Sequence, residues 1–249
     1  MKTSAFVISL ERATLRFENA HTLLDQLPLD AEVLPAVDGS QLSEDTKAAC
    51  YQPSLHDPEY PFLLNAGEIG CFLSHRNAWN EIINRNLDAA LIVEDDLRID
   101  QSKLGAAIDT LVQSNQDYGV VQLPVRILPR DSVRVERSEH CSIVLPRVTP
   151  LRTSAQWVTR QAATQLLKAT ERFDRPIDTF LQMHWLTGIP LYAISPSGLT
   201  DSTEEVGGST IGGPKSRGIK FEKVAREIRR AKYRWQISQL SSRNMRKSA

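Results

Sequence analysis

The chain has 249 residues, of which 41% are hydrophobic and 24% are charged, and its 30 Lys and Arg balance its 30 Asp and Glu. This composition excludes the disordered and collagen-like classes and suits one large globular domain or two small ones. The zero net charge hides an asymmetry, because residues 215–249 hold 12 basic and 2 acidic residues, whereas residues 1–214 hold 18 and 28. We therefore expect an acidic body (1–214) and a separate basic tail (215–249).

The bulk features also exclude several classes of protein. Cys50, Cys71 and Cys141 are too few and too widely spaced for a disulfide framework or a zinc finger, so we expect reduced thiols. The longest strongly apolar run, residues 89–93, is far shorter than the roughly 20 residues of a membrane helix. The apolar run at residues 5–10 is too short for a signal peptide and has no cleavage site. The expectation is a cytoplasmic chain.

The first half of the chain alternates between two hydrophobic periodicities. Strands are expected at residues 5–10, 32–37, 87–93 and 120–123, and helices at about 14–26, 67–85 and 103–112. The helix at 67–85 carries apolar residues on most of its surface, which indicates burial. Residues 50–65 contain three prolines and are expected to form a loop. Strands that alternate with helices predict an α/β fold with a mostly parallel sheet flanked by helices.

The second half is less regular. Residues 126–157 favour β structure and are interrupted by three prolines, which fits a hairpin or an excursion at the sheet edge. Helices are expected at 161–171 and 179–187, a strand at 191–194 and a glycine-rich loop at 201–214. This loop is not a Walker motif, because Pro214 separates its last glycine from Lys215.

Three consecutive acids, Glu94, Asp95 and Asp96, follow the strand at residues 87–93. Ligands of open α/β sheets bind at the carboxyl ends of the strands. If the backbone stays extended, Glu94 and Asp96 point to the same side. Such a pair could hold Mn²⁺ or Mg²⁺, which prefer carboxylate oxygens. The alternative is a polar strand end that only caps the following turn.

Two further segments could carry chemistry. Residues 67–79 place two glycines near a helix start, where a ligand or another backbone can approach and anions are favoured. Each polar or aromatic residue there also has an ordinary explanation: Glu68 as a first-turn acid, His75 as a core histidine and Trp79 as packing. Asp178 precedes a helical run, where it is either an N-cap or a general base.

Taken together, these segments resemble glycosyltransferase family 25, the bacterial lipooligosaccharide biosynthesis transferases and their relatives. In chain order, the matches are residues 6–10 with Arg12 and Arg16, residues 36–39 (AVDG), residues 67–75 (GEIGCFLSH) with Trp79, and residues 91–96 (LIVEDD), with weaker support from 176–178 and 195–197. The resemblance covers about residues 5–200. The segment 67–75 is its most specific part.

The resemblance implies a GT-A-like (Rossmann-like) fold, a UDP-sugar donor and a divalent metal, Mn²⁺ or Mg²⁺. It places the donor nucleotide against Ser9, Arg12, Arg16, Asp38, Gly39, Glu94 and Asp95. It places the metal on Glu94 and Asp96, with Asp96 as the first choice for direct coordination. Family members usually transfer galactose or glucose with inversion of the anomeric carbon.

Inversion requires a base on the face of the sugar opposite the departing diphosphate. Asp178 is our first candidate for this base, and Glu68 and His75 are the reserves. One segment departs from the family pattern: residues 153–157 read TSAQW where relatives often have Gly-x-x-Gly-Tyr. This departure implies either a changed substrate preference or a loss of activity, although the motifs at 67–75 and 94–96 are intact.

The basic tail predicts an amphipathic helix. Its apolar residues recur at spacings of three and four, at Phe221, Val224, Ala225, Ile228, Ala231 and Trp235. This stripe could lie on an anionic membrane surface, or it could pack on the acidic body or on a partner. Nucleic-acid binding has no supporting motif, and we do not expect it.

The leading hypothesis is a metal-dependent, inverting hexosyltransferase that acts on a cell-surface glycan such as lipooligosaccharide core. Its expected place is the cytoplasm, peripherally on the inner face of the cell membrane. The alternative is a non-catalytic module with a transferase-like fold that binds a nucleotide or a glycan. A metal-dependent phosphohydrolase is a weaker third reading, because the sequence holds no nucleophile motif for it.

Overall fold

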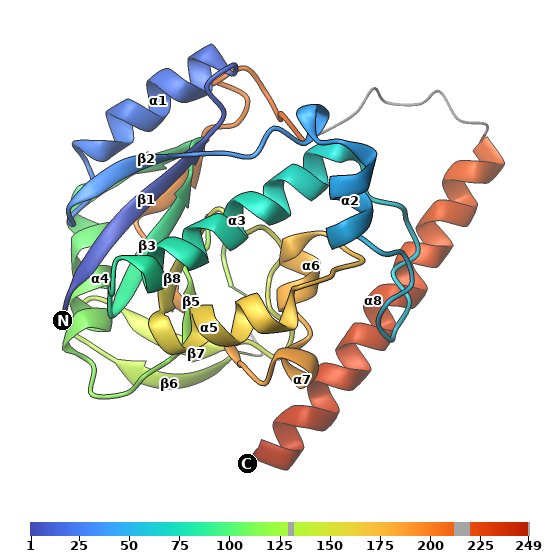
Figure 1. The fold of residues 1–249 in the computed structure, drawn as a ribbon. Helices are drawn as coiled ribbons and strands as arrows, with labels where there is room; N and C mark the ends of the chain where they lie inside the picture. Colours follow the sequence, from blue (N-terminus) through green and yellow to red (C-terminus); the bar gives the residue numbers. More distant parts are fainter. Residues whose placement is uncertain (129–131, 212–219, 249) are drawn as a thin grey trace.

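The protein is described from a computed structural model, over residues 1–128, 132–211 and 220–248. A sheet of eight strands forms its centre, in the order β2-β1-β3-β8-β5-β9-β7-β6 (Figure 1). The strands are β1 (Thr3–Ser9), β2 (Ala31–Pro35), β3 (Ala89–Glu94), β5 (Val120–Gln122), β6 (Val133–Arg137), β7 (Ser142–Leu145), β8 (Ala155–Thr159) and β9 (Leu191–Ser195). Because β8 and β7 run opposite to the other six, the α/β class and the mostly parallel sheet are confirmed.

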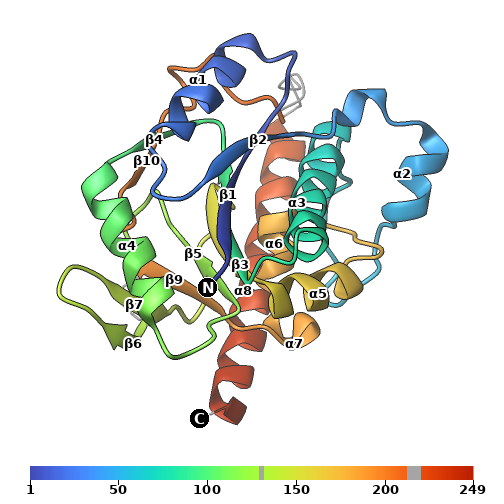
Figure 2. The ribbon, with the colours of Figure 1, turned by 60° about the vertical axis from the view of Figure 1, so that its left-hand side comes forward.

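Helices cover both faces of this sheet (Figure 2). The helices are α1 (Thr14–Leu24), α2 (Glu44–Cys50), α3 (Ala66–Asn84), α4 (Gln101–Gln113), α5 (Arg160–Ala169), α6 (Ile177–Leu181), α7 (His184–Thr187) and α8 (Lys220–Ser248), with a 3₁₀ turn, η1 (Gly39–Gln41). A separate pair of short strands joins β4 (Leu97–Ile99) to β10 (Leu199–Asp201). All seven strands and helices expected in the first half of the chain are present.

The strand alternation decides which core each side chain enters. On β3, Ala90 and Ile92 join the core under α3 and α5, whereas Leu91 and Val93 join the core under α1 and α4. Successive residues of a strand point to opposite faces, so a run that is apolar throughout must be buried on both. This is why the run at 89–93 contains no polar residue.

Three features differ from the sequence expectations. Helix α2 lies just before the expected loop at 50–65, in a segment for which no helix was expected, and Ser43 caps its start. The segment 155–159 forms β8, which lies antiparallel between β3 and β5 in the centre of the sheet. The single helix expected at 179–187 is two short helices, α6 and α7, separated by Gln182 and Met183; the buried Gln182 side chain donates to the carbonyl of Thr149.

Helix α8 packs against the body, but not through the predicted apolar stripe. Among the α8 side chains that the structure describes, Tyr233, Ile237 and Ser241 are buried, whereas Val224, Ile228 and Trp235 of the stripe are exposed, at 58–64%. Ala225 and Ala231 are exposed too, and the side chain of Phe221 lies outside the described residues, as does the 214/215 boundary expected between the body and the tail. Of the helices in the described ranges, α8 included, none has both the length and the apolar character needed to span a bilayer.

A buried polar cluster fixes the side of α8 that meets the body. Arg175 is fully buried, pairs with Asp174 and donates to the hydroxyl of Tyr233 at 2.8 Å and to the carbonyl of His56. A buried guanidinium without its acceptors is costly, so this hydrogen bond favours the face that carries Tyr233 over the more apolar stripe. Tyr60 also packs edge-on against the Tyr233 ring.

Replacing Tyr233 with Phe should lower the free energy of unfolding by about 1–3 kcal/mol, because the buried guanidinium of Arg175 loses an acceptor. Burial raises the pKa of Tyr233 to about 12. An unfolded tyrosine titrates near 10. The contribution of Tyr233 is therefore complete below about pH 10 and is lost as the pH rises toward 12. Urea unfolding as a function of pH measures both effects.

The matched control is Tyr192→Phe, on the other face of the sheet, which should lower the free energy of unfolding less than Tyr233→Phe does. Equal losses in the two variants would contradict the role of the Arg175 contact.

Candidate active site

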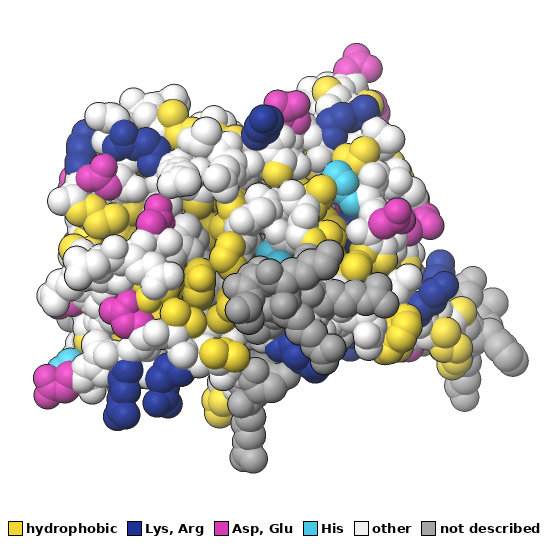
Figure 3. Space-filling view, turned by 90° about the horizontal axis from the view of Figure 1, so that it is seen from below, with side chains coloured by type: hydrophobic (Ala, Val, Ile, Leu, Met, Phe, Trp, Pro, Cys, Tyr) yellow, Lys and Arg dark blue, Asp and Glu magenta, His cyan; other side chains and the backbone are white. Residues whose placement is uncertain are grey.

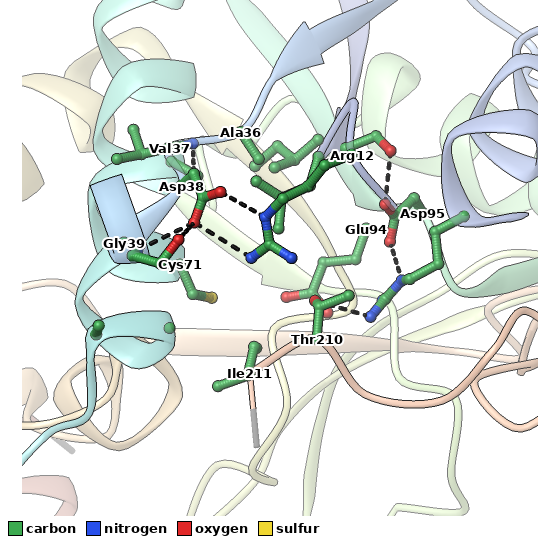
Figure 4. A pocket seen from close by; sticks show the side chains of 18 of the residues that line it. Arg12, Ala36, Val37, Asp38, Gly39, Cys71, Glu94, Asp95, Thr210 and Ile211 are labelled. Carbon is green, nitrogen blue, oxygen red and sulfur yellow. Dashed lines mark hydrogen bonds and ion pairs between the residues drawn. The ribbon is translucent and has the colours of Figure 1, made fainter. Parts of the chain in front are cut away.

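Two adjoining cavities lie at the carboxyl ends of β1 and β3. The first, of about 280 Å³, is walled by the end of β1, the β2–η1 connection, the start of α3 and the end of β3 (Figure 4). The second, of about 390 Å³, lies between the start of α3, residues 151–154 and the start of α6. Cys71, Glu94 and Ile211 line both cavities, so the two meet at the end of β3.

The middle acid of the triplet, Asp95, is held in place by hydrogen bonds. Asp95 is buried and accepts hydrogen bonds from the Ser9 hydroxyl at 2.6 Å and from Arg16 Nε at 2.7 Å. The pKa of Asp95 is raised by burial, against the lowering effect of Arg16 and Ser9. Ser9 and Asp95, both expected near the nucleotide, thus form part of the wall of the first cavity and are bonded to each other (Figure 4).

Glu94 and Asp96 both line the second cavity, although the backbone bends at Asp95 and Asp96 instead of staying extended as expected from the sequence. The His75 ring and the Thr153 hydroxyl both contact the same oxygen of Glu94, Oε1. Arg16 and Thr203 both contact Oδ2 of Asp96. These contacts leave Oε2 and Oδ1 as the oxygens that a cation would meet.

The electrostatics of this pair suit a divalent cation. Burial raises the pKa of Asp96, and the negative charge of Glu94 raises it further. Burial would also raise the pKa of Glu94, but hydrogen bonds from His75 and Thr153 and the charge of Arg16 outweigh it and lower the pKa. Two partly desolvated carboxylates at one site repel each other, and a hard cation between them relieves that cost. Carboxylate oxygens of this kind are the ligands that hard divalent cations prefer.

Arg16 connects the acidic triplet to a distant loop. Its guanidinium pairs with Asp95 at 2.7 Å and Asp96 at 2.6 Å, and its Nη1 donates to Thr210 at 3.1 Å. The sequence expectation placed Arg16 near the nucleotide, and it does line the first cavity. Most of its charge, however, is matched by two carboxylates. We infer that Arg16 mainly orients Asp96 and holds the 201–211 loop over the site.

Arg12 and Asp38 form a second ion pair, at the mouth of the first cavity (Figure 4). Arg12 reaches both carboxylate oxygens, and Asp38 also accepts from the backbone N–H and the hydroxyl of Ser40. The hydrogen bond from Arg12, followed by that of Ser40, holds the pKa of Asp38 far below its usual range. Asp38 therefore stays ionised, and it fixes the η1 turn beside the cavity.

The motif at 67–75 joins η1 to α3. A Cβ atom on Gly39 would lie 1.7 Å from the carbonyl oxygen of Ala66, and one on Gly70 would lie 2.6 Å from that of Val37. Ser74 accepts from the N–H of Val37 at 2.8 Å and donates to the carbonyl of Gly70. Only glycine allows this approach of two backbones. Gly39, expected to contact the donor, thus also permits the wall of the first cavity to form.

We expect Gly39→Ala to destabilise the chain by about 1–3 kcal/mol or more, because the added methyl group would overlap backbone atoms of α3. Gly105→Ala is the matched control: on α4 the new Cβ meets nothing within 4 Å, and alanine favours a helix over glycine by roughly 0.5–1 kcal/mol. Thermal unfolding of both variants measures the difference. Equal melting temperatures would contradict the close approach of η1 and α3.

The three candidates for a base are placed differently. Asp178 lines the second cavity from the first turn of α6, where it accepts from the backbone N–H groups of Thr179 and Arg152. The N-cap of α6 is Pro176, so the N-cap alternative for Asp178 is wrong. Glu68 lines the same cavity, but its carboxylate accepts the N–H of Asn65 in a capping box, and burial raises its pKa.

His75, the third candidate, is buried and lines the first cavity rather than the second. Its Nε2 lies 3.4 Å from Glu94 Oε1. Thr153 and Thr203, which donate hydrogen bonds to Glu94 and Asp96 from distant segments, were not predicted. A threonine hydroxyl carries no periodic signal, so nothing in the sequence could have revealed them. The altered segment at 153–157 nevertheless begins with one of the two.

Comparison with known proteins points to one family. The family model described as "Glycosyltransferase family 25 (LPS biosynthesis protein)" matches residues 2–181. A "Glycosyltransferase 25 family member" of Drosophila melanogaster is 31% identical over 186 residues, which is 72% of this chain and 30% of that protein. "Procollagen galactosyltransferase 1" of Danio rerio is 30% identical over 190 residues, 71% of this chain and 30% of that protein.

A third relative, "Probable inactive glycosyltransferase 25 family member 3" of Bos taurus, is 30% identical over 185 residues, again 71% of this chain and 30% of that protein. The match to each relative thus spans about a third of that relative's length. The family model, in contrast, covers most of this chain, including the motifs at 36–39, 67–75 and 91–96. The chain belongs to glycosyltransferase family 25.

Proposed function

We propose that the protein transfers a hexose, galactose or glucose, from a UDP-sugar to a hydroxyl group of a glycan acceptor, with the help of Mn²⁺ or Mg²⁺. The observation that carries this proposal is the meeting of two cavities at Glu94, with Asp96 beside it. A transferase needs two substrate sites that share one reaction centre, whereas a simple binding module needs one. Family membership and the name of the Danio rerio relative support a sugar donor, and galactose is the first to test.

The donor nucleotide fits the first cavity. Backbone groups of the Ala36–Gly39 wall and the ion pair of Arg12 with Asp38 lie where a base and a ribose would be recognised by polar contacts. The diphosphate would then extend toward Glu94 and Asp96. The metal held by these two acids would neutralise the charge that develops on the departing diphosphate.

The acceptor fits the second cavity, with Asp178 as the base that takes the proton of the attacking hydroxyl. Asp178 and the two acids of the triplet line this cavity from different elements, α6 and the end of β3. A base on one side of the sugar and a leaving group on the other is the arrangement that inversion requires. A cell-surface glycan such as lipooligosaccharide core is the acceptor class that we propose.

Calorimetry separates this proposal from the non-catalytic alternative, for which the bovine relative named as inactive is a precedent. UDP should bind in the presence of Mn²⁺ and more weakly in its absence. UDP-galactose or UDP-glucose should be hydrolysed slowly by water, and its sugar should be transferred rapidly when an acceptor is present. UDP binding without turnover of any donor would favour the binding module. Release of inorganic phosphate without sugar transfer would favour the phosphohydrolase.

We also propose that the outer face of α8 rests on an anionic membrane. Val224, Ile228 and Trp235 are exposed on one side of the helix, and the helical period places Lys232 and Arg234 on either side of them. Figure 3 shows hydrophobic side chains beside Lys and Arg side chains on this lower side of the molecule. Apolar side chains flanked by basic ones match an anionic lipid surface.

Vesicle flotation tests the membrane proposal. The full chain should float with vesicles that contain phosphatidylglycerol, and the variant with serine at Val224, Ile228 and Trp235 should float at least several-fold less. Binding should also weaken with salt, because the flanking charges contribute about 1 kcal/mol each near the surface. The control changes Leu63, which is exposed outside α8, to serine. Equal flotation of the triple variant would contradict the proposal, and a concentration-dependent dimer that the triple variant abolishes would assign the face to a second copy.

A further inference from the structure

Two residues of α3 and one residue of β3 form a cluster of side chains that commonly bind metals. The proposed transfer reaction does not use the three together. Cys71 and His75 are four residues apart on α3, so they share one side of the helix. Glu94 faces them from the end of β3, and Figure 4 shows the Cys71 sulfur directed toward its carboxylate. The sulfur, a ring nitrogen and a carboxylate oxygen all lie within 4.8 Å of one another.

The imidazole of His75 is poorly satisfied for a buried side chain. It is 1% exposed, and its Nδ1 has no hydrogen-bond partner among the described residues. Its Nε2 lies 3.4 Å from Glu94 Oε1, longer than a good hydrogen bond. With Zn–N and Zn–O bonds of about 2.0–2.2 Å, two ligands of tetrahedral zinc are about 3.3–3.6 Å apart. The His75–Glu94 spacing therefore lies in this range, whereas the full cluster, with atoms up to 4.8 Å apart, would have to contract around the ion.

We propose that Cys71, His75 and Glu94 bind a thiophilic cation, Zn²⁺, at a site that shares Glu94 with the Glu94–Asp96 pair proposed for Mn²⁺. A thiolate, an imidazole and a carboxylate are the ligands that zinc accepts, whereas Mn²⁺ and Mg²⁺ prefer oxygen alone. On binding, the Cys71 thiol releases its proton to solvent and its sulfur forms the bond to zinc. Because Cys71 and Glu94 line both cavities, a cation held by them would be accessible to molecules in the cavities.

The shared ligand gives the site a consequence for catalysis. Glu94 cannot serve zinc and the Mn²⁺ pair fully at the same time, so Zn²⁺ should inhibit sugar transfer and excess Mn²⁺ should relieve the inhibition. This consequence rests on the proposed transferase function. Zinc binding itself does not depend on that function, and cobalt spectroscopy measures the binding directly.

Cobalt is the probe for the site, because Co²⁺ takes zinc positions and absorbs in the near ultraviolet when a thiolate is bound to it. Co²⁺ added to the chelator-treated full chain should give this band at one equivalent, and Zn²⁺ should remove it. Cys71→Ser should abolish the band, whereas Cys50→Ser and Cys141→Ser should keep it. Glu94→Gln and His75→Gln should weaken binding at least about tenfold, while Asp96→Asn should retain the band. A folded wild-type chain without the band, or a band that survives Cys71→Ser, would overturn the proposal.

Alkylation of the wild-type chain provides a second readout that needs no variant. Zn²⁺ should slow the reaction of Cys71 with iodoacetamide several-fold, followed peptide by peptide by mass spectrometry, and should leave the partly buried Cys50 unaffected. Equal labelling of Cys71 with and without Zn²⁺ would overturn the proposal even if Cys71→Ser failed to fold. Zinc binding without transfer activity in any assay would instead retain the site and reject the proposed function.

Discussion

Asp96→Asn should lower the rate of sugar transfer by about 10²–10³-fold, the equivalent of a few kcal/mol of leaving-group stabilisation. The substitution keeps the size of the side chain and its contact with Thr203, but removes the charge that a divalent cation needs. Arg16 retains Asp95 as a partner, so the fold should survive. Initial rates at saturating donor and Mn²⁺ measure the effect, and the affinity for UDP should become nearly independent of Mn²⁺.

Asp100→Asn is the matched control for this result. Asp100 is the exposed N-cap of α4, four residues along the chain, and asparagine caps a helix about as well as aspartate. Its transfer rate should equal that of the wild type. Full transfer by Asp96→Asn, together with full transfer by the wild type after chelation, would remove the metal from the mechanism.

Asp178→Asn should lower kcat by about 10²–10⁴-fold, the usual contribution of a general base, with little change in the KM of the donor. Asparagine can still accept the hydrogen bond from the N–H of Thr179, so α6 should form. What is lost is the ability to take a proton from the acceptor hydroxyl in the second cavity. The ratio of transfer to donor hydrolysis should therefore fall as well.

Glu68→Gln distinguishes the two acids of the second cavity. Glutamine preserves the capping box with Asn65, so the start of α3 should remain in place. If Asp178 is the base, the Glu68 variant should keep its rate within a few-fold. A retained rate in Asp178→Asn combined with a large loss in Glu68→Gln would transfer the role to Glu68.

The sequence predicted the parts of the fold that depend on local pattern. The apolar runs of β1 and β3 and the alternation with helices require a sheet covered on both faces, and the structure has one. Glu94 and Asp96 also line the same cavity, but the chain bends at Asp95 and Asp96, so the extended backbone assumed for them is not what brings them together. The fold inference succeeds because a strand that is apolar throughout must be buried on both of its faces.

The parts that could not be predicted depend on contacts between distant segments. Helix α8 exposes its most apolar stripe because the buried Arg175 donates a hydrogen bond to the hydroxyl of Tyr233. The spacing of apolar residues in the sequence carries no information about such a hydrogen bond. The ion pairs of Arg16 with two acids 79 and 80 residues away in the sequence likewise form only in the folded chain. The supporting role of Thr153 and Thr203 depends in the same way on the folded chain.

The central claim is that the two cavities hold a donor and an acceptor for one transfer reaction at Glu94 and Asp96. A mass-shift screen tests it most directly: the full chain, Mn²⁺ and truncated lipooligosaccharide acceptors are incubated with UDP-galactose or UDP-glucose in turn. The account predicts that an acceptor gains the mass of one hexose with one of these donors, and that chelation or Asp96→Asn prevents the gain. An unchanged acceptor mass with both donors, from a chain that binds UDP and Mn²⁺, would contradict it.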